Sequence, residues 1–210
     1  MNGVDYFVGL VSAAVMIIGG YQFYFFVQRR HLGEARLLPT AIDDYIPFWP
    51  SWVWIYSGLY YPIIVALVFL QPDFRAYNYT AFSFLILLAM QFLVFLLLPT
   101  RVPDHWREFD PKQSMAHRFL GFVQSYDQLS NSLPSMHVSV ATLTAIHLYL
   151  GVEPLVGPSW ASLSYAFPLL ISLSAVFTKQ HYVIDLPPGV AFGWLAWRIS
   201  EWFLAAPGAA

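Results

Sequence analysis

The sequence contains no cysteine and little charge. None of its 210 residues is Cys, and Asp, Glu, Lys and Arg together make up only 10%. Without cysteine there is no disulfide framework, no thiolate nucleophile and no cysteine metal cluster. The formal net charge is -2 at pH 7, and no basic run stands apart from the apolar segments, so we expect no nucleic-acid partner.

Apolar side chains take the place of the missing charge. Hydrophobic residues make up 58% of the chain and the mean hydropathy is +0.56, which is more apolar surface than a soluble core of this length buries. Aromatic residues contribute 19%. Tryptophans near the ends of apolar runs are typical of the membrane interface, and those of this chain are Trp49, Trp52, Trp54, Trp106, Trp160 and Trp202. We therefore expect an integral membrane protein.

Six apolar segments are candidates for membrane helices. A helix needs about 20 residues to cross the hydrocarbon core. Strong runs cover residues 6–27, 52–70 and 81–98, and weaker runs cover residues 138–152, 161–177 and 189–205. No basic n-region precedes the first run, so we interpret it as a retained span rather than a signal peptide. The prediction is an all-α integral membrane protein in which one domain, residues 1–210, forms a six-transmembrane-helix bundle.

Six crossings place three polar segments on one membrane face. Residues 28–51 and 99–136 form long loops, and residues 178–188 follow the fifth helix. Because consecutive spans alternate in direction, these three segments share a face, while the short loops 71–80 and 151–160 lie on the other. An active site is therefore expected at the first face.

The first motif is Asn-Ser-Leu-Pro-Ser-Met-His, residues 131–137, where the second long loop becomes a membrane helix. Ser135 is predicted to be the N-cap, because its hydroxyl can accept from amides that the first turn leaves unpaired. Those amides and the helix dipole attract an anion. His137 then lies within one turn of a predicted anion site.

The second motif is Thr-Lys-Gln-His-Tyr-Val-Ile-Asp, residues 178–185, at the end of the fifth helix. His181 and Asp185 are four residues apart and would share one helical face. Asp185 is therefore expected to accept the Nδ1 proton of His181 and to leave Nε2 as a lone pair. Because the fourth helix leaves the face to which the fifth returns, we expect His137 and His181 to meet.

Simpler interpretations compete with this one. A histidine at a helix end commonly only forms a structural hydrogen bond, and a His-x-x-x-Asp spacing also occurs by chance. Ionisable groups at the ends of apolar spans are nevertheless costly and mark functional sites, and two such motifs on one face favour a site. The remaining histidines are interpreted as structural, with His147 bonded to a neighbouring helix and the others in loops: His31, His105 and His117.

The two motifs together resemble the type 2 phosphatidic acid phosphatase and haloperoxidase superfamily, which is marked by a Pro-Ser-x-His element followed by His-x-x-x-Asp. They look most like the branch containing the inositol phosphorylceramide synthases, over residues 99–189, and the region around Tyr56 fits that branch more loosely. The resemblance implies that His181 is the nucleophile, Asp185 its partner and His137 the acid for the leaving group. It also implies that Ser135 helps to hold the phosphate.

The chain departs from this family at two cationic positions. It has no Arg-Pro element upstream, and Ala175 stands six residues before the nucleophile, where an arginine is usual. Arg101 and Lys179 are predicted to bind phosphate in their place, and Arg107, Lys112 and Arg118 are further candidates. A phosphodiester carries one negative charge fewer than a phosphomonoester and tolerates missing cations better.

The predicted function is that of a metal-independent lipid phosphotransferase or phosphatase that works through a phosphohistidine and needs no cofactor. Its partners would be a lipid phosphate or phospholipid substrate, the bilayer and a lipid alcohol as acceptor. Head-group transfer from a phosphodiester lipid is favoured over monoester hydrolysis of the phosphatidic acid or isoprenyl phosphate type. Two other classes stay open: a metal enzyme in which His137, His181 and Asp185 are ligands, and a non-enzymatic anion-binding membrane protein.

The side of the membrane that carries the site stays open. Eight of the ten cations fall on the motif face and two, Arg75 and Arg198, on the other. The positive-inside rule then places the motifs in the cytoplasm, whereas the resemblance implies a periplasmic or lumenal site. Either assignment agrees with a multi-pass protein of a bacterial inner membrane or an equivalent membrane.

Overall fold

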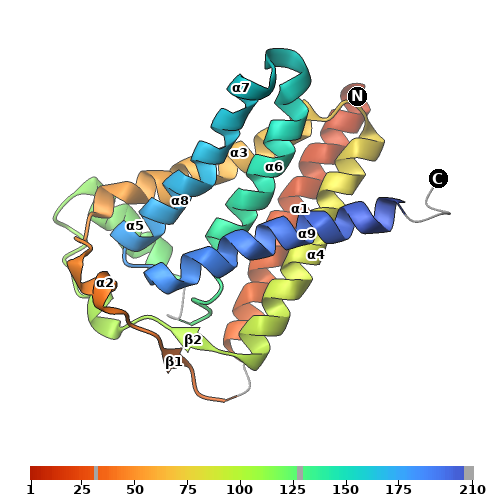
Figure 1. Ribbon diagram of the computed structural model, residues 1–210. Helices are drawn as coiled ribbons and strands as arrows, with labels where there is room; N and C mark the ends of the chain where they lie inside the picture. The colour runs from red at the N-terminus through yellow and green to blue at the C-terminus, as the bar shows by residue number, and fades with distance from the viewer. Residues whose placement is uncertain (31–32, 127–129, 206–210) are drawn as a thin grey trace.

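The computed structural model describes residues 1–30, 33–126 and 130–205, and most of this part of the chain is helical (Figure 1). Its longer helices are α1 (Gly3–Gln28), α3 (Tyr60–Leu70), α4 (Phe74–Leu97), α5 (Met115–Ser125), α6 (Met136–Val156), α8 (Ala166–Phe177) and α9 (Leu186–Ala205). Two short helices are α2 (Ala41–Tyr45) and α7 (Pro158–Ala161). Strands β1 (Arg36–Leu37) and β2 (Thr100–Arg101) form one small parallel pair. His31 lies outside the described residues.

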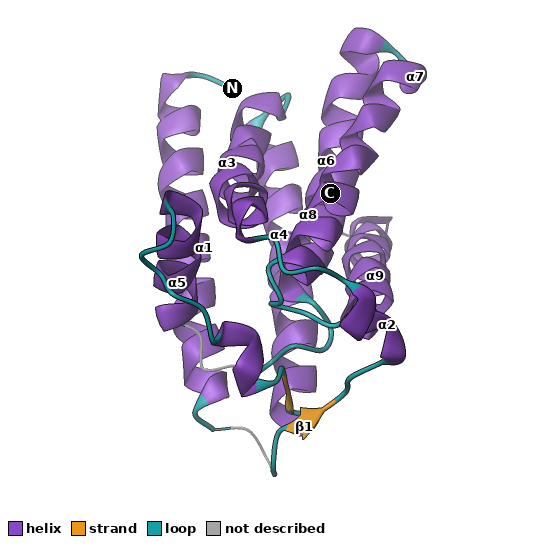
Figure 2. Cartoon of the chain, turned by 90° about the vertical axis from the view of Figure 1, so that its left-hand side faces the viewer, coloured by secondary structure: helices purple, strands orange, loops and turns teal. Residues whose placement is uncertain are grey.

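Five continuous helical segments are long and apolar enough to cross a membrane. They are Gly3–Gln28, Pro50–Leu70, Phe74–Leu97, Met136–Val156 and Pro158–Phe177. The prediction of membrane helices is confirmed for these five. The sixth predicted span forms helix α9, but it carries Arg198 and Glu201 and runs across α4 and α6 instead of alongside them (Figures 1 and 2). Six spans are therefore not confirmed.

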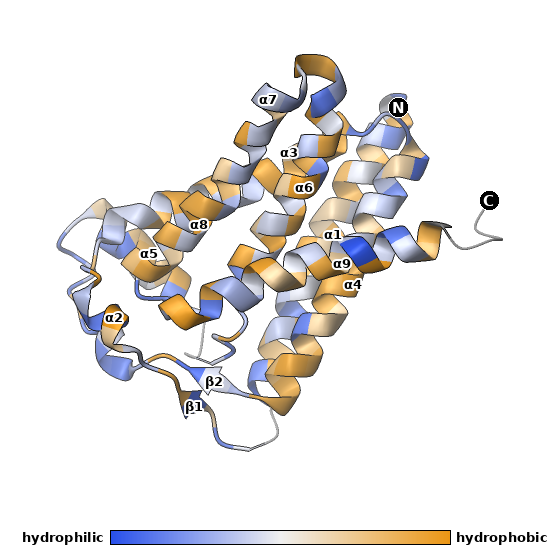
Figure 3. Ribbon diagram, viewed as in Figure 1, coloured by the Kyte–Doolittle hydropathy of each residue, from blue (hydrophilic) through white to orange (hydrophobic). Residues whose placement is uncertain are grey.

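The long polar segments gather at one end of the bundle, as the alternation of helix direction predicts. Figure 3 shows the hydrophilic residues of α2, β1 and β2 at the end opposite α7 and the N-terminus. Backbone hydrogen bonds join these segments: Arg36 N donates to Pro99 O at 3.0 Å, and Trp49 N donates to Phe177 O at 2.8 Å. The loops therefore form one connected surface over the ends of the helices.

One predicted loop is shorter than expected. Residues 71–80 were expected to be a loop, yet α4 already begins at Phe74. Asp73 explains the early start, because its carboxylate accepts from Ala76 N at 2.7 Å and caps the helix.

The long loop at residues 99–136 contains a helix that was not predicted. Helix α5 has an amphipathic pattern, with Ala116, Leu120 and Gln124 buried and Met115 and Phe122 exposed. Apolar residues at spacings of three and four were the signal for it. This helix covers one side of the loop region.

Helix α6 lies at the centre of the bundle, and α9 packs closely against its first turns. Glycines four residues apart on α9 allow this approach, in the manner of a G-x-x-x-G interface. A Cβ added at Gly189 would come within 2.9 Å of Ser135 O, and one at Gly193 would come within 2.8 Å of Thr142 Cβ. The start of α6, which carries the first motif, is therefore held by backbone contact.

Candidate active site

The first motif forms the predicted helix N-terminus. Ser135 is the N-cap of α6, and its hydroxyl accepts from Val138 N at 3.4 Å. Its own amide donates to Asp185 O at 3.1 Å, which joins the first motif to the second. Ser135 is fully buried. The capping prediction is confirmed, and His137 lies in the first turn of α6.

The second motif is a helix end followed by a sharp turn, not a continuous helix. Helix α8 ends at Phe177, and Lys179 adopts a positive φ of 56°. Lys179 N donates to Val176 O at 3.2 Å and Gln180 N to Ala175 O at 2.9 Å. This is the hydrogen-bond pattern of a Schellman motif, with lysine at the position that glycine usually takes. The expectation that His181 and Asp185 share one helical face was wrong, because the chain turns between α8 and them.

His181 nevertheless reaches Asp185. Its Nδ1 lies 2.9 Å from Ser132 O and 3.3 Å from Asp185 Oδ2. Both partners are acceptors, so Nδ1 carries the proton and Nε2 of the neutral ring keeps its lone pair. Asp185 is fully buried, and the same Oδ2 accepts from Tyr182 N at 3.0 Å. The carboxylate is thereby fixed against the ring.

His137 is held by two tyrosines. Its Nδ1 lies 3.0 Å from the Tyr56 hydroxyl, and its ring stacks on Tyr56 with centroids 4.1 Å apart. Tyr60 packs on it at 4.7 Å. Tyr56 belongs to a π-helical segment, Trp54–Leu59, and such segments are frequent at functional sites. Sequence reasoning did not include Tyr56 in the site, because no spacing pattern marks the start of a π-helix.

The two histidines meet, as the direction of the helices predicts. Their ring centroids are 6.4 Å apart and their planes are inclined by 61°. Both rings line one pocket of about 380 Å³, together with Asn131 and Gln180. Tyrosines from α1, the π-helical segment, α3 and the end of α5 form much of the remaining lining: Tyr21, Tyr24, Tyr56, Tyr60, Tyr61 and Tyr126. We call this space the histidine pocket.

The predicted phosphate-binding cations have partners elsewhere. The Lys179 ammonium donates to Asp43 O at 2.7 Å and lies 4.8 Å from the centre of the Trp106 ring. Burial lowers the pKa of Lys179. Arg101 forms an ion pair with Asp104. Among the described residues, no lysine or arginine lines the histidine pocket.

Asp43 is a second residue that sequence reasoning missed. It is 2% exposed, and its Oδ1 accepts from Val183 N at 2.9 Å, inside the second motif. Its Oδ2 accepts from Thr40 N at 2.7 Å, which gives the Thr-x-x-Asp pattern of a capping box. That pattern was the available signal, but it does not disclose the contact with a segment 140 residues away.

Tyr182 ties the second motif to β2. It is fully buried, and its hydroxyl lies 3.1 Å from Arg101 O. Burial raises the pKa of Tyr182 to about 12, so the hydroxyl stays protonated and donates to this carbonyl at neutral pH. The residue beside His181 is therefore anchored to β2.

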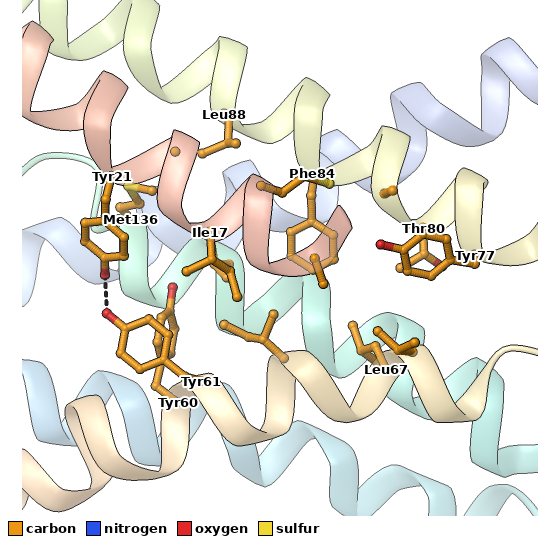
Figure 4. Close-up of a pocket in the computed structure, with 17 residues that line it drawn as sticks. Ile17, Tyr21, Tyr60, Tyr61, Leu67, Tyr77, Thr80, Phe84, Leu88 and Met136 are labelled. Atoms are coloured by element: carbon orange, nitrogen blue, oxygen red, sulfur yellow. Dashed lines mark hydrogen bonds between the residues drawn. The ribbon is translucent and has the colours of Figure 1, made fainter. Parts of the chain in front are cut away.

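An apolar cavity adjoins the histidine pocket inside the bundle (Figure 4). It has a volume of about 100 Å³ and is lined by side chains of α1, α3, α4 and α6, among them Ile17, Leu67, Phe84 and Leu88. Four residues line both spaces: Tyr21, Tyr60, Tyr61 and Met136. The hydroxyls of Tyr21 and Tyr61 are hydrogen-bonded at the boundary. The histidine pocket thus borders an apolar space inside the bundle.

The three candidate metal ligands do not surround one point. Asp185 contacts Nδ1 of His181, so its carboxylate lies behind this ring and away from Nε2. Within residues 1–30, 33–126 and 130–205, no three His, Asp or Glu side chains gather as a possible metal site. The arrangement instead gives a base with an oriented lone pair beside a second imidazole.

Comparison with known proteins identifies the family. The family model described as PAP2 superfamily matches residues 33–199. No curated protein and no solved structure matches the chain. The match includes both histidine motifs and also Asp43 and Tyr56, so it extends well beyond residues 99–189, where the resemblance was seen. The match covers most of the chain and includes both His137 and His181, so this protein belongs to the PAP2 superfamily.

Proposed function

We propose that this protein is a membrane lipid phosphotransferase in which His181 attacks the phosphorus and His137 protonates the leaving oxygen. Membership of the PAP2 superfamily supports an enzyme of the lipid phosphatase or phosphotransferase type. One observation carries the assignment of roles. Nδ1 of His181 faces two acceptors, which leaves the lone pair of Nε2 for attack, and the second imidazole lies 6.4 Å away in the same pocket.

The first step forms a phosphohistidine. Nε2 of His181 donates its lone pair to phosphorus, and the bond from phosphorus to the leaving oxygen breaks. That oxygen takes a proton from Nε2 of His137, which enters the step as the imidazolium and leaves it as the neutral ring. The positive charge that develops on the His181 ring is stabilised by Asp185 through Nδ1. Tyr56, at Nδ1 of His137, orients the acid.

The second step transfers the group to an acceptor. Water or a lipid alcohol attacks phosphorus and gives its proton to His137, while the bond between phosphorus and His181 breaks and Nε2 regains its lone pair. Both histidines then return to their initial protonation states. Histidine suits both roles near neutral pH, and the cycle needs neither metal nor cofactor.

The other predicted residues act around this pair. Ser135 supports the site by capping α6, whose first-turn amides and dipole favour an anion. Arg101 and Lys179 contribute positive charge from outside the pocket lining, where their partners hold them. Electrostatic stabilisation of this kind is the main requirement of phosphoryl transfer.

The substrate is a lipid whose chain enters the bundle. The apolar cavity shares Tyr60 and Met136 with the histidine pocket, so a hydrocarbon chain in the cavity would bring its phosphate to the histidines. We propose head-group transfer from a phosphodiester, as in the branch containing the inositol phosphorylceramide synthases, because no lysine or arginine lines the described part of the pocket. Hydrolysis of a lipid phosphomonoester is the alternative.

Turnover by purified protein tests the proposal. The detergent-solubilised protein is given radiolabelled phosphatidic acid, phosphatidylinositol or phosphatidylglycerol, each with and without ceramide or diacylglycerol. We expect an acid-labile label on His181, transfer to the added alcohol, inhibition by vanadate and no effect of a chelator. Release of inorganic phosphate alone would favour the phosphatase. Full turnover by folded His181→Ala, or no turnover and no label with any lipid, would overturn the proposal.

A further inference from the structure

We infer that Asn131 and Gln180 form a neutral hydrogen-bonding site for the phosphodiester group of a hydroxyl-bearing lipid. This inference rests on the proposed function and specifies which groups recognise the substrate. It starts from polar side chains of the histidine pocket that have no hydrogen-bond partner in the described part of the protein.

Asn131 is the first of these side chains. It is 2% exposed, it lines the histidine pocket, and both its Oδ1 and its Nδ2 lack a partner among the described residues. Its backbone has a positive φ of 66°, a conformation that asparagine tolerates better than most residues. A buried amide whose oxygen and nitrogen both lack a hydrogen bond destabilises the folded protein, unless a ligand supplies the missing hydrogen bonds.

Gln180 is the second residue of the histidine pocket with an unpartnered polar atom. It is 6% exposed, lines the same pocket and has an unpartnered Nε2 within the described residues. The turn at Lys179 brings it into place immediately before His181. Ser130, which also lines the pocket, adds an unpartnered hydroxyl. Four unpartnered polar atoms therefore belong to residues that line the same pocket as the two histidines: Ser130, Asn131 and Gln180.

Their location distinguishes these groups from other unpartnered atoms of the bundle. Gln91 Oε1 also lacks a partner in the described residues, but Gln91 lines neither the histidine pocket nor the apolar cavity, and its Nε2 bonds to Ser139. By contrast, the residues that carry those four unpartnered atoms, Ser130, Asn131 and Gln180, all line the histidine pocket, which has a volume of about 380 Å³. The terminal torsions of Asn and Gln are soft, so their amides turn towards a ligand at little cost.

Amides suit a phosphodiester better than a phosphomonoester. The amide N–H groups donate to the non-bridging oxygens, and Asn131 Oδ1 accepts from a hydroxyl of the head group or of the incoming alcohol. The free energy of removing an anion from water rises steeply with its charge. Because no cation lines the described part of this pocket, the singly charged diester is held and the doubly charged monoester is disfavoured.

Three variants and a control test whether the amides of Asn131 and Gln180 recognise the diester. Asn131→Gly keeps the positive φ and removes the amide, Gln180→Met keeps the length and removes the hydrogen bonds, and Gln180→Lys adds a cation. Gln91→Met is the control, since it changes a buried amide outside the pocket. The kcat/KM values of purified protein on phosphatidylinositol and on phosphatidic acid are compared, and tryptophan fluorescence on heating shows which variants are folded.

We expect Asn131→Gly and Gln180→Met each to lower kcat/KM on phosphatidylinositol by about tenfold or more. Gln180→Lys should raise the ratio of phosphatidic acid to phosphatidylinositol turnover by about tenfold, and Gln91→Met should leave that ratio unchanged. If Asn131→Gly does not fold, Asn131→Asp replaces it and should lose activity most on the monoester. Folded variants with unaltered ratios and unaltered diester turnover would overturn the inference. The proposed function fails separately, when the wild-type protein turns over no lipid phosphate.

Discussion

Two histidines of helix α6, His137 and His147, differ in the groups that surround their ring nitrogens. His147 has both ring nitrogens at hydroxyls of α4, with Nε2 2.8 Å from Ser83 Oγ and Nδ1 3.4 Å from Thr80 Oγ1. His137 has Nδ1 at Tyr56, while its Nε2 has no hydrogen-bond partner within the described ranges. The prediction that His147 bonds a neighbouring helix is confirmed.

His137 and His147 therefore differ in whether one ring nitrogen stays available for a ligand. His181 follows the same pattern as His137, with Nδ1 occupied by Ser132 O and Asp185. Both rings line the histidine pocket, whereas His147 lines neither that pocket nor the apolar cavity.

His181→Gln should have the largest effect. Glutamine retains polarity but cannot form the phosphohistidine, so kcat/KM on any turned-over lipid should fall by about 10⁴-fold or more. His147→Gln is the matched control and should stay within about threefold of wild type, because its ring serves packing between α4 and α6. The rates are measured on purified proteins of equal thermal stability. Similar losses in both variants would remove the distinction between the two kinds of histidine.

His137→Gln should lower kcat/KM on a lipid alcohol ester by about 10³-fold, because the leaving oxygen loses its proton donor. On a substrate with a p-nitrophenyl leaving group the loss should be only about tenfold, because that oxygen departs without protonation. Both substrates are assayed with the same preparation. An equal loss on the two would show that His137 does not act as the acid.

Asp185→Asn should lower kcat by about 10²-fold with little change in KM. The effect is expected to be smaller than that of His181→Gln, because Ser132 O still accepts the Nδ1 proton at 2.9 Å. Steady-state kinetics of the folded variant measures it. A loss as large as that of His181→Gln would mean that the carboxylate alone fixes the ring.

Tyr56→Phe should have the smallest effect, a loss of about tenfold in kcat/KM. The substitution keeps the ring that stacks on His137 and removes the hydroxyl at Nδ1. Tyr60→Phe is the control, because Tyr60 contacts the same imidazole through its ring. Its kcat/KM should change less than that of Tyr56→Phe, and the reverse order would assign the orienting role to Tyr60.

Much of the fold followed from patterns within short stretches of sequence. Apolar runs predicted five confirmed membrane-length helices, and Ser135 was correctly predicted as the cap of α6 because capping depends on neighbouring residues. Helix α5 and the early start of α4 were not predicted, although their signals are also local. These signals are the apolar spacing within α5 and the cap formed by Asp73. The meeting of His137 with His181 required one step more, the alternation of helix direction.

Other features depended on contacts between distant segments. Tyr56 reaches His137 across 81 residues, and Asp43 reaches Val183 across 140. Sequence also predicted Lys179 at the phosphate, but the turn after α8 directs its ammonium to Asp43 O and Trp106. No local pattern contains these partners.

Local patterns in the chain were enough to predict a helical membrane protein with a serine-capped first motif and two histidines on one face, because hydrophobic length, capping and helix direction are local or additive properties. Three features depend on packing between distant segments: which nitrogen of each ring stays available, which cations lie outside the pocket lining and which amides of its lining residues have no partner among the described residues. Those outcomes depend on hydrogen bonds across tens of residues, and their geometry exists only once the helices have packed.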